Sequence, residues 1–573
     1  MPVWQDALQT IVMSTYDYDH IVIGSGFGGS VAALRLAQKG FRVLLIEAGK
    51  RWKASDLPRS SWQLRKYLWK PALRLFGIQR IDFLRHVAVL SGAGVGGGSL
   101  IYGNTLFVPL APFFERPEIQ ALGGALELLP YYKLAERMMG VVPNPHLTPA
   151  DEILRETAAE YGRADTFTPS PVGVFFGDPE QETADPYFQG EGPARSGCRL
   201  CGGCFLGCRY NAKNSLDRNY LPLAESLGVE IRAETHVTRI QPLSPNGSEG
   251  YRIHTKSSTS WRGRPHRSFT TQSVVVSAGV LGTLKLLHRA RDRGDLPNLS
   301  PQLGERVRTN SESIVGVRAR DRRADFSRGL AASSSVFPDE HTQIQADRYP
   351  AGSDSMSVMS TLLVDGGGRI PRWLRFIGCA LRRPLDFFRV TWPFGFARQS
   401  VLLVVMQTLE GHLRINRRRR WWWPFGRVLD SEIGSDGHTP TYIPIANDFA
   451  RRMAQRMNGV ALSSTPEVLR DTPATAHILG GCPIGTSPEE GVIDEQHRVF
   501  GYENLRICDG TVIPANLGVN PALSILAFSE RALSFVPPKE GDGAGITHLR
   551  VDESWEVKAL LTRPQPTSSE SQG

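Results

Sequence analysis

The feature that most constrains the fold is a glycine-rich turn between an apolar run and a helical pattern. The run at 20–23 leads directly into Gly24-Ser25-Gly26-Phe27-Gly28-Gly29, and a helical pattern follows. Strand, tight turn and helix in this order are typical of a dinucleotide-binding βαβ unit. In such a unit Gly24 permits the turn, Gly26 lets the backbone approach a pyrophosphate, and Gly29 lets the helix pack against the strand.

A second apolar run, at 42–46, ends in an acid that supports the same interpretation. Glu47 stands 18 residues after Gly29, where a carboxylate accepts a hydrogen bond from an adenosine ribose and repels a 2′-phosphate. A glycine-rich turn alone is weak evidence and is also found without function. Because strand, helix and acid agree here, we predict an α/β chain with a Rossmann-like dinucleotide site.

Length and composition restrict the class of protein. The 573 residues allow several domains, and 41% hydrophobic with 21% charged residues is typical of a globular chain. No stretch approaches the ~20 apolar residues that a bilayer span needs. The first residues lack a basic segment followed by an apolar one, so we expect no signal peptide and a cytoplasmic protein.

The net charge of +9 is concentrated in one segment. Residues 372–427 hold twelve Arg, no Lys and two acids, a local balance of +10, together with eleven aromatic residues. Aromatic rings and Arg stems suit a lipid headgroup boundary, although single-stranded nucleic acid uses similar chemistry and a solvated Arg-rich hairpin is an alternative. We predict that 372–427 docks on an anionic membrane and that nucleic acid is not a partner.

Further motifs identify which dinucleotide is bound. A second glycine-rich loop occupies 92–99, and His477, the pair Asp509-Gly510 and the pair Asn520-Pro521 stand near the end of the chain. With these motifs the sequence resembles the glucose-methanol-choline (GMC) family of FAD oxidoreductases, and within it the cholesterol oxidases that bind FAD non-covalently. The matching segments are 21–49, 90–106, 212–224, 277–299 and 501–532.

The resemblance implies a non-covalent FAD site assembled from distant segments. The backbone of Val237 would face the adenine, the stretch 92–104 would run along the flavin, and Asp509 with Gly510 would meet the ribityl and pyrophosphate region. The residues implied to bind FAD are Gly24, Gly26, Phe27, Gly28, Gly29, Glu47, Gly94, Gly97, Gly98, Ser99, Asn104, Val237, Asp509, Gly510, Asn520 and Pro521.

The resemblance also implies a catalytic pair, His477 and Asn520. Oxidation of an alcohol on a flavin needs a base or acceptor for the hydroxyl proton, because the carbinol hydride passes to flavin N5. Taken alone, His477 is equally typical of a buried core histidine, and Asn520 of a helix cap before Pro521.

One departure from the family pattern bears on the identity of the substrate. Steroid-specific members of the family also isomerise a double bond with a carboxylate, and the strand 342–349 places Gln345 at that position. An amide takes up no proton at neutral pH. Asp347, two residues on, is expected on the same face of the strand and is the alternative.

Four cysteines form a compact group with metal-ligand spacing. The series Cys198, Cys201, Cys204 and Cys208 has the spacing of a bacterial ferredoxin loop, although Arg209 replaces the usual proline. An iron–sulfur cluster, structural zinc and a reduced cysteine-rich turn are the alternatives. A cluster near the flavin would let electrons leave one at a time, so oxidase and dehydrogenase are both open.

We therefore predict an FAD-dependent enzyme that oxidises a secondary alcohol, such as a 3β-hydroxysterol, with oxygen or another acceptor. The alternatives are a GMC dehydrogenase of a non-steroid alcohol, an NAD(P)-dependent enzyme, and a non-catalytic flavin-binding protein docked on a membrane. The predicted organisation is an N-terminal extension at 1–15, an FAD-binding domain at 16–105, 200–305 and 472–537, a substrate domain with a sheet roofed by helices at 106–199 and 306–471, and a mostly disordered tail at 538–573.

Overall fold

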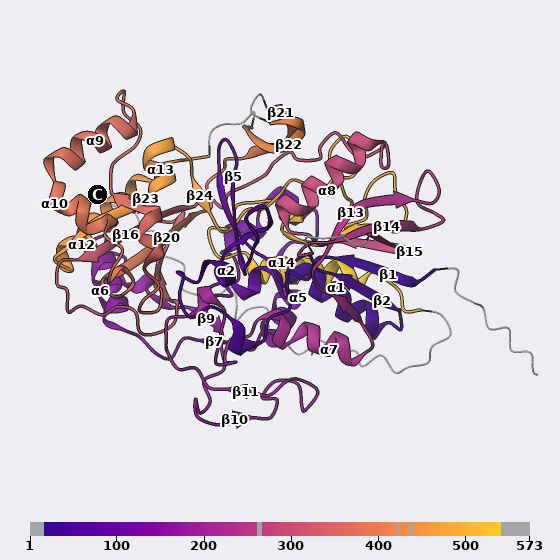
Figure 1. Cartoon of the computed structure of the whole chain (residues 1–573), viewed down its shortest axis with the longest axis horizontal. Helices are drawn as coiled ribbons and strands as arrows, with labels where there is room; N and C mark the ends of the chain where they lie inside the picture. The colour runs from indigo at the N-terminus through magenta and orange to yellow at the C-terminus, as the bar shows by residue number, and fades with distance from the viewer. Residues whose placement is uncertain (1–15, 261–265, 421–422, 435–438, 540–573) are drawn as a thin grey trace, which may run out of the picture.

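The computed structural model describes residues 16–260, 266–420, 423–434 and 439–539. The predicted N-terminal extension and nearly all of the predicted tail lie outside these residues. The described chain forms two large sheets that stand side by side, each with its own helices (Figure 1). No helix in this part of the chain is long and apolar enough to span a bilayer.

The first sheet contains the predicted βαβ unit. Its path runs β12-β2-β1-β15-β14-β13, and β25 pairs with β15. Strands β12, β2, β1, β15 and β25 pair in parallel, whereas β13, β14 and β15 form an antiparallel meander. The bounds are β1 Tyr18–Ile23, β2 Val43–Ile46, β12 Glu230–Arg232, β13 Thr235–Pro242, β14 Tyr251–Ser257, β15 His266–Val276 and β25 Leu505–Ile507. All seven strands fall within the segments predicted for the FAD-binding domain.

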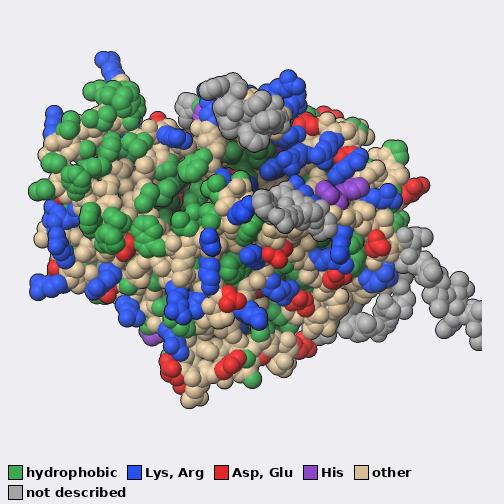
Figure 2. All heavy atoms as spheres, in the orientation of Figure 1, with side chains coloured by type: hydrophobic (Ala, Val, Ile, Leu, Met, Phe, Trp, Pro, Cys, Tyr) green, Lys and Arg blue, Asp and Glu red, His purple; other side chains and the backbone are tan. Residues whose placement is uncertain are grey.

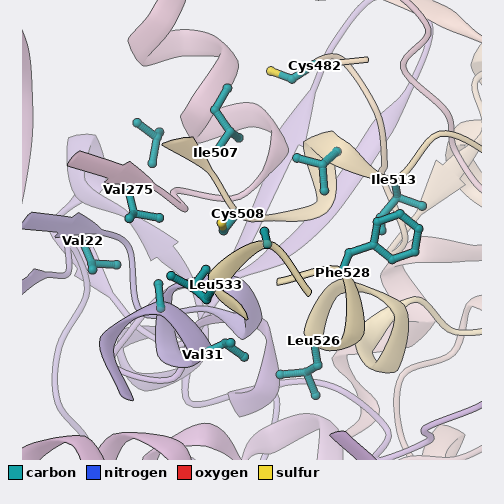
Figure 3. Packing of buried hydrophobic residues seen from close by; sticks show 14 of the residues in the cluster. Val22, Val31, Val275, Cys482, Ile507, Cys508, Ile513, Leu526, Phe528 and Leu533 are labelled. Carbon is teal, nitrogen blue, oxygen red and sulfur yellow. The ribbon is translucent and has the colours of Figure 1, made fainter. Parts of the chain in front are cut away.

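Helices from distant segments pack on this sheet and on each other. Helix α1 contacts α14 and α7, α14 contacts α5, and α8 contacts β13. Figure 3 shows the core between them, where Val22 and Val275 of the strands face Val31 of α1 and Leu533 of α14. The bounds are α1 Phe27–Gln38, α5 Gly124–Met138, α7 Tyr220–Ser226, α8 Val280–Arg293 and α14 Ala522–Ser534.

The second sheet is covered by helices on both faces, which confirms the predicted roofed sheet. Its order is β19-β23-β16-β20-β18-β17-β8, with every pair antiparallel. Alternate residues of β20 point to opposite faces, so Leu403 packs towards α6 and α12, whereas Leu402 packs towards α9 and α10. The strands are β8 Thr168–Pro169, β16 Ser313–Ala319, β17 Ala332–Val336, β18 Thr342–Asp347, β19 Ser360–Leu362, β20 Ser400–Gln407 and β23 Gly459–Ser464. The helices are α6 Pro149–Ala159, α9 Arg372–Arg382, α10 Pro384–Thr391, α11 Phe396–Gln399, α12 Pro444–Arg456 and α13 Thr465–Arg470.

Short elements complete the fold. The three-stranded sheet β24-β6-β5 carries the segment that leads to His477, and β21 pairs with β22 as a separate hairpin. The bounds are β5 Gln79–Phe83, β6 Ala88–Gly92, β24 Ala474–Thr475, β21 Leu413–Arg420 and β22 Trp423–Ile433. The remainder are α2 Leu64–Tyr67, β3 Trp69–Lys70, β4 Leu75–Phe76, α3 Ala111–Phe114, α4 Pro117–Gln120, β7 Val141–Pro143, β9 Pro171–Gly173, β10 Glu182–Thr183 and β11 Arg195–Ser196.

A buried ion pair joins the first and last helices of the dinucleotide fold. The Arg35 guanidinium on α1 lies 2.6 Å from the Glu530 carboxylate on α14, and the Tyr220 hydroxyl of α7 donates to the same carboxylate. Because both charged side chains are almost fully buried, neither has water as an alternative partner.

We expect Glu530→Ala to lower the free energy of unfolding by about 3–5 kcal/mol, because it leaves the Arg35 charge buried and uncompensated. Denaturant unfolding followed by circular dichroism measures this loss. The matched control is Glu152→Ala, which removes the partner of Arg155 in an exposed pair on α6 and should cost less than about 1 kcal/mol. Equal losses in the two variants would contradict the argument.

Candidate active site and cofactor site

A cavity of about 430 Å³ lies between the two sheets. One end is walled by the glycine-rich turn of β1–α1 together with Glu47 and Val237. The other end is walled by strands β18 and β20 of the second sheet, including Leu402 and Val404. A cavity of this size, mostly apolar with a few polar groups, is typical of a cofactor and substrate site.

The glycines of the turn have different roles in the structure. Gly24 has φ +104°, and a Cβ there would lie 2.2 Å from the Ser277 carbonyl oxygen. A Cβ on Gly28 would lie 1.8 Å from the Cys508 carbonyl oxygen, and one on Gly29 would lie 1.9 Å from the Gly24 carbonyl oxygen. Gly24, Gly28 and Gly29 are thus required for backbone packing.

Gly26 alone faces open space. Nothing lies within 4 Å of a Cβ built on Gly26, which lines the cavity directly before α1 begins at Phe27. The N–H groups of the first helical turn and the helix dipole favour an anion at this place. The turn therefore fits the pyrophosphate of a dinucleotide.

Glu47 lies against the same turn. Its Oε2 accepts hydrogen bonds from the Ser25 backbone N–H at 3.1 Å and the Ser25 hydroxyl at 2.7 Å, and its Oε1 accepts from the Gly49 N–H at 2.7 Å. The carboxylate is buried and lines the cavity, as does Val237 on β13. This placement fits a ribose hydroxyl beside the glycine turn.

The second glycine-rich loop divides into two sets of residues. Gly97 and Gly98 line the cavity with Phe27. Gly94 and Ser99 are not among its lining residues: the Gly94 carbonyl accepts from Ser25, and the Ser99 hydroxyl accepts from the Leu216 N–H at 2.9 Å. These two residues hold the loop in place.

Asn104 and Asp509 also differ in their relation to the cavity. Asn104 is buried with φ +71° and does not line the cavity. Asp509 and Gly510 line it, and the Asp509 carboxyl accepts from the Thr283 hydroxyl at 2.5 Å and the Thr511 N–H at 2.9 Å. Burial raises the pKa of Asp509 above its usual value.

The structure brings the predicted pair His477 and Asn520 together. The Asn520 amide nitrogen lies 3.4 Å from His477 Nε2 and donates to Gln345 Oε1 at 3.2 Å. All three residues line the middle of the cavity, and Pro521 lines it beside Asn520 at the start of α14. Asn520 Oδ1 and Gln345 Nε2 are buried and find no hydrogen-bond partner among the described residues. A polar group of a ligand would satisfy both atoms.

Glu312 is a site residue that sequence reasoning missed. His477 Nδ1 lies 3.0 Å from Glu312 Oε2, although no hydrogen bond joins the two atoms. The same oxygen accepts from the Thr475 hydroxyl at 2.7 Å and the Ala476 N–H at 3.0 Å. The carboxylate thus holds the two residues before His477 as well as its ring.

Asn310, two residues earlier, does the same for Asn520. Its Oδ1 accepts from the N–H groups of Leu517 and Gly518 at 2.9 and 3.0 Å, and its Nδ2 donates to the Val519 carbonyl at 2.9 Å. Asn310 therefore fixes the loop immediately before Asn520. No motif in the sequence marks this residue.

Asp347 lies on β18 two residues after Gln345, and both side chains line the cavity as predicted for one face of a strand. Burial raises the pKa of Asp347 well above its usual value, with the Glu312 charge adding to the shift and Arg348 opposing it. This environment favours a neutral carboxyl group.

The four clustered cysteines are all free. Nowhere in the described residues, which include all four, do three or more His, Cys, Asp or Glu side chains form a group that could hold a metal. Burial raises the pKa of Cys198 to about 12 and that of Cys204 to about 11, which favours the neutral thiols. Neither the iron–sulfur nor the zinc prediction has support in this geometry.

Comparison with known proteins identifies the family. Two models described as GMC oxidoreductase match residues 194–324 and 442–529, and an NAD(P)-binding Rossmann-like model matches 22–52. A cholesterol oxidase of Acinetobacter baumannii is 43% identical over 96% of this chain and 100% of its own length. A cholesterol oxidase of Mycobacterium tuberculosis is 46% identical over 91% of this chain and 92% of its own.

A solved structure shares the fold at low identity. Pyridoxine 4-oxidase from Mesorbium loti matches with a TM-score of 0.56 and 14% identity over 90% of this chain and 98% of its own. The chain belongs to the GMC oxidoreductase family. It is an FAD-dependent alcohol oxidoreductase, and the open turn at Gly26 beside Glu47 fits the dinucleotide half of FAD.

We expect Gly26→Val to fold normally and to lose FAD. The added Cβ has no described atom within 4 Å, and the branched side chain extends into the space in front of the helix N-terminus. The absorbance of purified protein at about 450 nm, compared with that at 280 nm, reports flavin content, and circular dichroism reports folding. Folded Gly26→Val with stoichiometric FAD would remove the turn from the cofactor site.

Proposed function

We propose that this enzyme oxidises the 3β-hydroxyl group of a sterol to a ketone. The main observation is that His477 and Asn520 lie side by side in the middle of one cavity, between the dinucleotide end and an apolar end. The two relatives at 43% and 46% identity, both named cholesterol oxidase, support a sterol as the alcohol. Oxygen or another acceptor would take up the electrons.

The chain's own residues would act on the hydroxyl group of the substrate. When bound, FAD supplies a hydride acceptor at its N5 atom. His477 Nε2 faces Asn520 and accepts the hydroxyl proton as general base. The Asn520 amide nitrogen, which lies 3.4 Å from His477 Nε2, would donate to the hydroxyl oxygen and hold it in place.

Residues Asn310 and Glu312 would position this pair. The imidazole of His477 is held by the Glu312 carboxylate, which also stabilises the positive charge that develops when His477 takes up a proton. The Asn520 loop is held by Asn310. Both are positioning residues, because they act through His477 and Asn520.

The product would leave mainly as the unconjugated ketone. Gln345 has no titratable group, and burial raises the pKa of Asp347 and disfavours its charged form. Coupled movement of the double bond is therefore expected to be slow.

Anaerobic bleaching of the flavin absorbance at about 450 nm by a panel of alcohols tests the proposal. We expect 3β-hydroxysterols to bleach it and 3α-epimers and short alcohols to bleach it far more slowly. His477→Ala should bind FAD normally and react about 10²- to 10⁴-fold more slowly with the sterol. Bleaching by short alcohols only would rule out the sterol, and an unchanged rate would rule out His477.

Glu312→Gln should separate positioning from binding. The amide keeps the size of the side chain and an acceptor for the Ala476 N–H, but loses the charge beside His477. We expect kcat for flavin reduction to fall about tenfold or more with KM nearly unchanged, and Glu312→Asp to restore part of kcat. A change in KM alone would contradict the role.

A further inference from the structure

Helices α9 and α10 expose an apolar surface with no cover in the described structure. Leu381 is 77% exposed and Leu385 80%, although both are large apolar side chains. Figure 2 shows the hydrophobic side chains gathered on the side of the molecule that carries α9 and α10. We call this surface the α9–α10 patch; its members are Ile370, Trp373, Leu374, Ile377, Leu381, Leu385, Phe388, Trp392 and Phe394.

Helix α9 is apolar on two faces. Phe376, Cys379 and Ala380 pack inward against the second sheet, whereas Ile377 and Leu381 point outward. A helix that packs one apolar face on the core needs only polar residues on its other face. The second apolar face therefore indicates a further apolar partner.

Charges around the patch identify that partner as an anionic surface. Residues 366–400 contain seven Arg and a single acid, Asp386, which pairs with Arg320 at 2.6 Å and with Arg389 at 3.7 Å. Arg398 pairs with Asp325, and Arg372 is buried. Arg382, the last residue of α9, and Arg383, directly before α10, form no ion pair with any described residue. Apolar and aromatic side chains bordered by Arg are typical of an element that lies in the headgroup boundary of a bilayer.

The Arg-rich hairpin β21–β22 behaves differently. Its guanidinium groups pair with acids, so most of its charge is neutralised within the protein. The pairs are Arg414 with Glu305, Arg417 with Asp292, Arg418 with Glu432, and Arg420 with Asp430. Of the aromatic residues predicted here, Trp421 and Trp422 lie outside the described residues. The structure thus favours only the first part of 372–427 as a docking surface.

The same helices cover the apolar end of the cavity. Tyr349, Met356 and Leu402 line the cavity and pack in one cluster with Phe376 of α9 and Phe387 of α10. Helices α9 and α10 therefore pack against residues that line the apolar end of the cavity.

We propose that the α9–α10 patch inserts into the surface of an anionic phospholipid bilayer and admits a water-insoluble alcohol to the apolar end of the cavity. Insertion rests on the patch itself, whereas the nature of the alcohol rests on the proposed function. Basic residues near an anionic surface add on the order of 1 kcal/mol each, screened by salt, and buried apolar groups add a salt-resistant part.

Co-sedimentation of the holoenzyme with sterol-free vesicles tests insertion. The vesicles contain phosphatidylcholine with or without phosphatidylglycerol. We expect binding to the anionic vesicles, and a loss of about tenfold or more in Leu381→Ser/Leu385→Ser/Phe388→Ser. The matched control Leu73→Ser/Leu126→Ser changes exposed leucines elsewhere, and Arg414→Gln/Arg418→Gln changes the paired hairpin; both should bind like wild type.

A second measurement separates this proposal from the proposed function. Flavin reduction by sterol dispersed in cyclodextrin should be equal in wild type and the triple variant, whereas reduction by vesicle-borne sterol should be slow only in the variant. Vesicle binding without any reduction by dispersed sterol would refute the sterol and leave insertion standing. Absent or equal vesicle binding, or a dimer that only the triple variant abolishes, would overturn insertion.

Discussion

The site depends on one short turn, residues 310–312, which leads into β16 of the second sheet. Asn310 and Ser311 both adopt left-handed backbone conformations, with φ 57° and 45°. Side chains with local hydrogen bonds sustain such strained conformations, and here Asn310 binds the loop before Asn520 while Glu312 binds the segment around His477. The proposed catalytic pair, His477 and Asn520, is thereby fixed in position.

Both sheets contribute walls to the cavity, so they have to meet at this place. Parallel strands β1 and β2 deliver the glycine turn and Glu47 to one end. Strand β20 delivers the apolar side chains of Leu402 and Val404 to the other, and its neighbour β18 adds the polar Gln345 and Asp347. The polar groups in the middle would meet the only polar group of an otherwise apolar alcohol. Specificity for such an alcohol then follows from burial, because an unmatched polar group in the apolar end would be left without a partner.

The dinucleotide end of the cavity could be predicted from local sequence, because its strand, turn, helix and acid follow one another closely along the chain. The order of strand, turn, helix and acid fixes Gly26 and Glu47 through backbone geometry alone. His477, Asn520 and Gln345 were predicted from the resemblance to the family and from the alternation of side chains along a strand. Glu312 and Asn310 were not predicted, because their partners lie far along the chain and only the tertiary fold brings them together.

Two sequence patterns, the Arg-rich segment and the cysteine series, described their own residues correctly but not the surroundings of those residues in the fold. The segment 372–427 is strongly basic, but arginines of its hairpin pair with Asp292 and Glu305, which lie outside the segment. The sequence of the segment alone could not show this pairing. The cysteine spacing matched a ferredoxin loop, whereas burial favours thiols there. Spacing fixes distance along the chain but not the environment that decides ionisation.

The most direct test of this account is anaerobic stopped-flow reduction of the bound flavin by a 3β-hydroxysterol deuterated at its carbinol carbon. If His477 and Asn520 hold the hydroxyl so that the carbinol hydride faces the cofactor, reduction should be clearly slower with deuterium than with hydrogen. Glu312→Gln should lower both rates while the isotope effect persists. Flavin that the sterol does not reduce would contradict the account.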